Sequence, residues 1–199
     1  MKKSLLISPI ILLAALFAVT TVFAGSGFSQ TYVARDQSYS FAYPDDWQVG
    51  FNTDYQAPVV SNERVEVFVF GPADAQNFEL PFAPTTAVEF ANALAQKWAD
   101  IVQGPVMALE VGGRPAARVD FLFHNAPGFF LVIDLGNGAF AVFETFGYES
   151  SALALDEATI YAIAESFVVL GEPVPDAILD LQDSFAVSTD GSDGEFLPK

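Results

Sequence analysis

The sequence predicts an α+β fold in which one antiparallel β-sheet carries a helix on each face, an α-β-α sandwich. Four apolar segments follow one another between residues 106 and 146, separated by glycine-bearing turns, which is typical of an antiparallel meander. The third of these segments, Phe129–Ile133, is apolar at every position, so neither side of that strand can face water. Two segments with helical periodicity, one before the meander and one after it, can cover the two faces.

The strands before the meander are predicted from aromatic and β-branched residues. In Tyr39–Tyr43 the aromatic residues occupy alternate positions, which places three rings on one face of a strand. A proline and two aspartates then indicate a turn, and residues 47–51 are expected to return as the second strand of a hairpin. After a polar loop, the Val- and Phe-rich residues 64–70 predict a third strand.

The first helix is predicted to begin at Thr86. Thr86 and Glu89 have the spacing of a capping box, in which each side chain binds a free amide of the first turn. Apolar residues then recur at helical spacing; they are Phe90, Leu94, Trp98 and Ile101. A glycine and a proline at 104 and 105 end the segment.

The second helix is predicted over residues 156–169. Its buried stripe would consist of Ile160, Ile163, Ala164 and Phe167. With the first helix on one side of the meander and this one on the other, the predicted layers are helix, antiparallel sheet and helix.

The N-terminal segment predicts export. Two lysines precede the apolar run Leu5–Phe23, which closes in small residues at Ala24, a pattern typical of a signal peptide. The run is also close to the length of a spanning helix, so residues 1–24 are interpreted as a signal peptide or an uncleaved membrane anchor. Either reading gives an exported protein, extracellular or periplasmic. The chain has no cysteine, which excludes a lipid-anchored cysteine, disulfides and thiol catalysis.

The remaining chain divides into three parts by composition. Residues 25–31 are predicted to form a polar linker, residues 32–170 one domain, and residues 171–199 an acidic, flexible tail. The whole chain of 199 residues has a formal net charge of −17 at pH 7. Nucleic acid and anionic lipid headgroups would be repelled, so we expect no nucleic-acid partner and membrane contact only through an uncleaved Leu5–Phe23.

One small polar cluster is predicted on a face of the meander. Arg118, Asp120 and His124 share a strand parity, and Glu144 lies near the outer half of the last meander strand. In one interpretation Arg118 pairs with Asp120 or Glu144 and its charge is neutralised. In the other, Asp120 and Glu144 serve a carboxylate-dependent hydrolase of the cell envelope.

Other chemistry has little support in the sequence. His124 is the only histidine, so a histidine-based metal site lacks a second ligand, and no nucleophile elbow of the Gly-x-Ser-x-Gly type occurs. The segment Asp190–Glu195 offers oxygen ligands for calcium, but its spacing is not that of an EF-hand loop. Calcium binding by the tail therefore stays an alternative to a solvated tail, and we expect no cofactor.

The order of these elements resembles the PsbP-like group, which includes exported proteins of the PsbP, DcrB and LpqN types. In that group an aromatic strand runs into a proline turn and a tryptophan, as in Tyr39–Trp47, and the final helix ends in a Ser-Phe pair, here Ser166–Phe167. The turn Gly113–Ala116 is similar to the Gly-x-Pro/Ala turn common there. The resemblance covers residues 32–170, but no metal-binding or photosystem-docking residue can be matched, so a photosynthetic role is not implied.

The resemblance implies an α-β-α sandwich used mostly without catalysis, as an assembly or binding module. We therefore expect an exported, non-enzymatic domain that contacts an unknown protein or a small apolar ligand held between sheet and helix. A concave site with Asp120 and Glu144 within hydrogen-bond reach would favour the hydrolase. Dispersal of the four residues of the polar cluster among ion pairs would favour the binding module.

Overall fold

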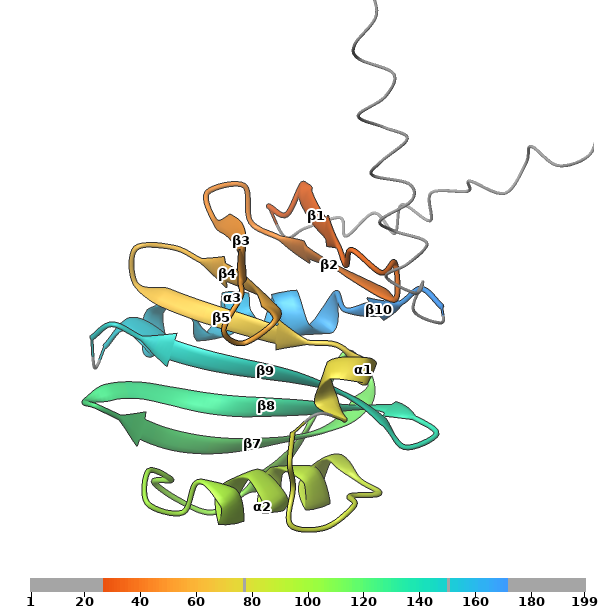
Figure 1. Cartoon of the computed structure of the whole chain (residues 1–199). Helices are drawn as coiled ribbons and strands as arrows, with labels where there is room; N and C mark the ends of the chain where they lie inside the picture. The colour runs from red at the N-terminus through yellow and green to blue at the C-terminus, as the bar shows by residue number, and fades with distance from the viewer. Residues whose placement is uncertain (1–26, 77, 150, 172–199) are drawn as a thin grey trace, which may run out of the picture.

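A computed structural model describes residues 27–76, 78–149 and 151–171 of the chain, and these residues form two antiparallel sheets and three helices (Figure 1). The large sheet has the strand order β3-β4-β5-β9-β8-β7-β6, and the small sheet has the order β1-β2-β10. The strands are β1 (Gln30–Val33), β2 (Tyr39–Tyr43), β3 (Gln48–Asn52), β4 (Ala57–Ser61), β5 (Val65–Phe70), β6 (Met107–Val111), β7 (Arg114–Phe123), β8 (Ala126–Gly136), β9 (Ala139–Gly147) and β10 (Val168–Val169). The helices are α1 (Pro72–Ala75), α2 (Ala87–Lys97) and α3 (Ala152–Glu165).

The predicted meander is confirmed. Strands β6, β7, β8 and β9 pair in chain order, each antiparallel to the next. At the β6–β7 turn, Gly112 and Gly113 have φ angles of +56° and +76°, and at the β7–β8 turn His124 and Asn125 have φ angles of 49° and 67°. Two consecutive positive φ angles give the turn whose twist matches that of the flanking strands.

Helices cover both faces of the large sheet, as predicted, so the α+β class with an α-β-α arrangement is confirmed. Phe90 of α2 lies in one core, together with side chains from α1, β5, β7, β8 and β9. Phe167, just after α3, lies in a second core on the other side of the sheet. The small β1-β2-β10 sheet packs on this second side beside α3, because the aromatic face of β2 belongs to the same core.

The predicted hairpin of β2 with residues 47–51 is wrong. Strand β2 pairs with β1 and β10, whereas β3 pairs with β4, a strand that the sequence analysis took for a polar loop. The alternating aromatic residues of β2 identified a strand and its buried face. They did not identify its partner, because the turn after Tyr43 carries the chain from one sheet to the other.

The ends of the domain differ from their predicted positions by a few residues. Strand β1 begins at Gln30, inside the predicted linker of residues 25–31, because Gln30 pairs with Tyr43. Helix α3 ends at Glu165, and the two valines that were assigned to it form β10 against β2. The predicted signal segment 1–24 and all but the first residue of the predicted tail 171–199 lie outside the described residues.

Hydrogen bonds to β7 and β2 fix the C-terminal end of α3. The guanidinium of Arg114 donates hydrogen bonds to the carbonyl oxygens of Phe167 at 2.9 Å and Ala164 at 3.0 Å, where the helix leaves acceptors unsatisfied. The Ser166 hydroxyl accepts a hydrogen bond from the Ala42 amide at 2.8 Å. The Gly-Arg turn and the Ser-Phe pair of the sequence therefore meet at one joint between sheet and helix.

Gly128 allows β8 and β7 to pack closely, which generates a stability prediction. A Cβ at this position would overlap the ring of Phe121 and the carbonyl oxygen of Thr145. We expect Gly128→Ala to lower the free energy of unfolding by about 1–3 kcal/mol, as overpacking of a tight core does. Urea denaturation measures the change.

Gly104→Ala is the matched control, because a Cβ at Gly104 meets no atom within 4 Å. Equal midpoints for the two variants would contradict the predicted overlap at Gly128.

Candidate functional site

Two members of the predicted polar cluster, Arg118 and Asp120, form an ion pair on the α3 side of the sheet. The Arg118 Nε lies 2.6 Å from Asp120 Oδ1, and its Nη1 lies 2.6 Å from Glu157 Oε1 of α3. The guanidinium also stacks 4.1 Å from the centre of the Phe129 ring. The charge of Arg118 is thus neutralised by carboxylates from two elements, which fastens α3 to β7.

The other two members of the predicted cluster lie elsewhere. His124 is exposed in the β7–β8 turn, where its ring packs edge-on against Phe123 at 4.3 Å between centroids. Glu144 stands directly across from Phe130 of β8 and Phe68 of β5, and both rings belong to the α2-side core. Glu144 therefore points to the face opposite the Arg118–Asp120 pair.

The prediction of one polar cluster is therefore wrong, and strand register is the reason. Arg118 is paired with Leu131, and Leu131 with Phe143, so Phe143 shares the face of Arg118 and the next residue, Glu144, takes the other face. Asp120 and Glu144 are separated by the sheet. This separation removes the arrangement that a hydrolase using these two carboxylates would need.

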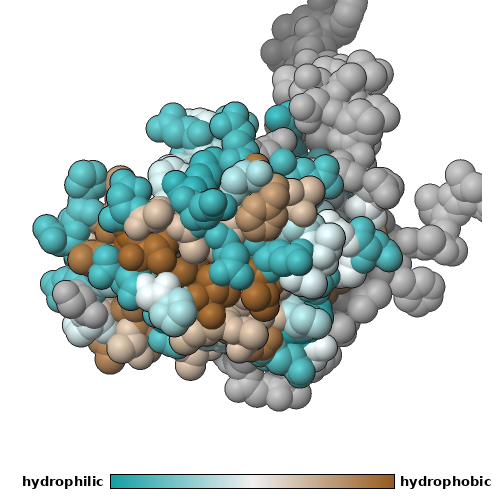
Figure 2. Space-filling model, turned by 90° about the horizontal axis from the view of Figure 1, so that it is seen from below, coloured by the Kyte–Doolittle hydropathy of each residue, from teal (hydrophilic) through white to brown (hydrophobic). Residues whose placement is uncertain are grey.

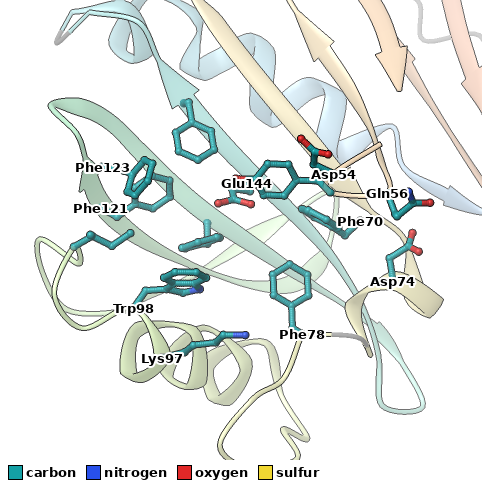
Figure 3. A pocket seen from close by; sticks show the side chains of 14 residues that line it. Asp54, Gln56, Phe70, Asp74, Phe78, Lys97, Trp98, Phe121, Phe123 and Glu144 are labelled. Atoms are coloured by element: carbon teal, nitrogen blue, oxygen red, sulfur yellow. The ribbon is translucent and has the colours of Figure 1, made fainter. Parts of the chain in front are cut away.

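Glu144 instead lies in a pocket on the α2 side with a volume of about 430 Å³. Its walls are mainly aromatic: Tyr55, Phe70, Phe78, Trp98, Phe121, Phe123, Phe130 and Phe146 line it. Figure 3 shows Glu144 in the middle of the pocket, with Phe121 and Phe123 to one side, Phe70 to the other and Trp98 below. A space-filling view of the side that carries α2 shows a band of hydrophobic residues between polar ones (Figure 2).

The C-terminal end of α2 forms one side of the pocket. The predicted apolar stripe continues to Trp98 and Ile101, but the helix ends at Lys97 with Trp98 as its C-cap. Phe90 and Leu94 within the helix are buried, whereas Trp98 is 39% exposed. Helix α2 packs on β6, β7 and β8, and Trp98 at its C-terminal end forms one wall of the pocket beside the helix.

Ring-to-ring contacts hold the walls of the pocket in place. Phe121 lies 4.8 Å from Phe130 and 5.2 Å from Phe146, and the Tyr55 ring lies 4.9 Å from Phe68. Tilted and edge-to-face pairs at these separations are favourable geometries for aromatic side chains. The pocket is consequently formed before any ligand enters.

Glu144 is a half-buried charge in the middle of the pocket. Burial raises the pKa of its carboxyl group from 4.5 to about 7. Among the residues that the structure describes, no hydrogen bond or ion pair to this carboxyl group is found. A carboxyl group with a raised pKa that lies in a pocket without an ion-pair partner is a candidate functional group.

Three further charged groups line the pocket at its edges. Asp54 lies in the β3–β4 turn, Asp74 lies on α1, and Lys97 lies at the exposed end of α2. Burial raises the pKa of Asp74, although a hydrogen bond from the Gly71 amide opposes the shift. The Lys97 ammonium sits 5.6 Å from the centre of the Trp98 ring, a cation–π distance.

A preformed apolar cavity with a few polar groups is the usual form of a small-molecule site. The sequence analysis expected an apolar ligand between sheet and helix but named none of these aromatic residues as its site. The available signal was the presence of 20 phenylalanines in 199 residues, but composition does not say which rings remain open to solvent.

Metal and membrane features can be tested only on part of the chain. Within residues 27–76, 78–149 and 151–171, no group of three or more side chains is arranged to hold a metal ion, and no helix is long and apolar enough to cross a bilayer. The calcium candidate Asp190–Glu195 and the apolar run Leu5–Phe23 lie outside these residues.

Comparisons with known proteins find distant similarity to solved structures. The solution structure of cyanobacterial PsbP (CyanoP) from Synechocystis is 15% identical, with 74% of this chain and 95% of that chain covered and a TM-score of 0.44. A Bacteroides thetaiotaomicron protein is 14% identical, with coverage of 80% and 60% and a TM-score of 0.43. A Pseudomonas aeruginosa protein of unknown function is 12% identical, with coverage of 75% and 100% and a TM-score of 0.34.

No protein-family model matches the chain, and a search of curated proteins finds no match either. The cyanobacterial protein bears the name of the group that the sequence resembles. Nothing about the function of this chain follows from a likeness this distant.

The raised pKa of Glu144 generates a pH-dependent stability prediction. The folded-state pKa is about 7 and the ordinary value is 4.5, so between these values the folded state binds more protons and stability falls as pH rises. We expect Glu144→Gln to be more stable than the wild type by about 1–3 kcal/mol at about pH 9, and equal to it near pH 4. Urea denaturation at both pH values measures this difference.

The two proteins share every other titrating group, so their difference isolates Glu144. A variant that is less stable than the wild type at about pH 9 would show that the ionised carboxyl group has a stabilising partner.

Proposed function

We propose that this chain is an exported, non-catalytic binding protein that holds a small apolar molecule in the pocket between α2 and the sheet. The observation that carries the proposal is the cavity of about 430 Å³ with aromatic walls around one unpaired carboxyl group. Export is supported by the lysine-led apolar segment that closes at Ala24. If that segment stays attached, it would also be the means of membrane contact.

The size and lining of the pocket support a small ligand as its occupant. Sites for drug-sized molecules have volumes of this order, mostly apolar walls and a small number of polar groups. Trp98 and Phe123 are 39% and 42% exposed at its edge. A ligand that covered these two side chains would remove apolar area from water, which is the main source of affinity in such sites.

The hydrolase that would use Asp120 and Glu144 together has no support in the geometry. Asp120 lies across the sheet from Glu144 and is paired with Arg118, so the two carboxyl groups cannot act on the same bond. The acidic balance of the chain disfavours nucleic acid as a partner. A protein partner from the cell envelope could insert an apolar side chain into the same space.

A neutral aromatic alcohol tests this proposal. Phenylbutanol should bind the full chain in isothermal titration calorimetry, and Trp98→Ala should weaken that binding about tenfold or more, because Trp98 forms one wall. Trp98 is partly exposed, so its removal leaves both cores intact.

Phe51→Ala is the matched control, because Phe51 is an aromatic residue of β3 that is 55% exposed and does not line the pocket. Binding should also change the fluorescence of Trp98. The second tryptophan, Trp47, is buried in the core on the other side of the sheet and should not respond. Equal weakening by both variants, or no binding, would overturn the proposed site.

A further inference from the structure

We propose that the pocket selects organic cations with an apolar body, and that a protonated amine on such a ligand pairs with Glu144. This inference rests on the proposed function and specifies the chemical class of its ligand. The geometry that points to it is a half-buried carboxyl group in the middle of a ring of aromatic side chains (Figure 3).

The charges of the pocket favour a cation over an anion. Three carboxyl groups line it, those of Asp54, Asp74 and Glu144, against the single ammonium of Lys97. Glu144 is half-buried in the middle, whereas Lys97 is exposed at the end of α2. An anionic ligand with its body in the pocket would place its charge near Glu144, and the formal net charge of −17 adds to that repulsion.

The aromatic walls provide a second attraction for a cation. The faces of Trp, Tyr and Phe carry negative potential, and rings of such residues are a known means of holding ammonium groups. The pocket already shows the interaction at its edge, where the Lys97 ammonium lies 5.6 Å from the centre of the Trp98 ring. Phe121, Phe130 and Tyr55 present further rings around Glu144.

The lack of an ion-pair partner for Glu144 among the described residues favours a cationic ligand. Two other charged side chains near the sheet have ion-pair partners within the chain. Arg118 pairs with Asp120 and Glu157, and Asp156 pairs with Arg64. Glu144 has none among the described residues. An ammonium group would restore the hydrogen bonds and the charge balance that burial denies to this carboxylate.

The affinity for an amine should therefore depend on pH. The titratable groups that line the pocket with Glu144 are Asp54 and Tyr55 from the β3–β4 turn, Asp74 from α1 and Lys97 from α2, while its cross-strand neighbours on β5 and β8 are phenylalanines. The pKa of Glu144 is about 7 in the empty pocket. Amine binding should strengthen as pH rises through this value, because a simple alkylamine keeps its proton there.

Three probes with one body and different heads test the inference: phenylbutylamine, phenylbutanol and phenylbutyrate. In calorimetry with the full chain at about pH 8, the amine should bind about tenfold or more tightly than the alcohol, and the carboxylate should bind most weakly. Glu144→Gln should reduce the ratio of amine affinity to alcohol affinity to within about threefold. Measurable alcohol binding by the variant also shows that it is folded.

Glu110→Gln is the matched control, because it removes the same charge from an exposed position on β6 that does not line the pocket. It should leave the preference for the amine intact. Lowering the pH to about 6 should weaken amine binding and not alcohol binding, since ionised Glu144 attracts only the cation.

The outcomes separate the two proposals. If the alcohol binds but the amine shows no advantage, or if the two Gln variants lose the amine preference equally, the cation inference is overturned and the apolar site stands. Tighter binding of the carboxylate would overturn the inference in favour of an anion held by Lys97. Failure of all three probes to bind would overturn the proposed function itself.

Discussion

The two-sided burial of strand β8 is the constraint on which the rest of the structure depends. Six consecutive residues of this strand, from Gly128 to Ile133, are buried, so their side chains alternate between two cores and both faces of the sheet must be covered. Helices α1 and α2 cover one face. Helix α3 and the small β1-β2-β10 sheet cover the other. One layer cannot cover both faces of β8, so the fold places a layer on each side of the sheet.

The layers on the two faces of the large sheet differ in how fully they cover it, and the candidate function follows from this difference. On the α3 side, polar links tie the layers together: Arg118 bridges β7 to α3, and Arg64 binds Asp156 of α3 through two hydrogen bonds of 2.7 Å. On the α2 side the helix packs on β6, β7 and β8, and the pocket lies beside it. Aromatic side chains that would otherwise be core are left around an open space, which makes one face structural and the other available to a ligand.

The position of Glu144 has a cost for folding that its proposed role would explain. A glutamine or an apolar residue there would avoid burying a charge, and burial accordingly raises the pKa of Glu144 to about 7. Arg118 is also partly buried but has two carboxylate partners. The contrast separates a charge that fastens layers together from one that is left open for a partner outside the chain.

The sequence by itself determined the layers of this protein. The continuous apolar run of β8, the glycine turns of the meander and the helical stripe that begins at Phe90 were sufficient to predict a sheet with a helix on each side. These features are local, because hydrophobic periodicity and turn preferences depend on residues that are close together in the sequence. The second helix and the strand of residues 39–43 were recognised for the same reason.

Only the tertiary structure decided strand partners, register and the site. The partner of β2 depends on which sheet the chain enters after Tyr43. The face of the sheet on which Glu144 lies depends on the register between β7 and β8 and on that between β8 and β9. A shift of one residue in any of these pairings would have moved Glu144 to the side of Arg118. The pocket likewise depends on how α1 and α2 are placed against strands that are distant in sequence. These are long-range relations, and no pattern within a single segment of the chain encodes them.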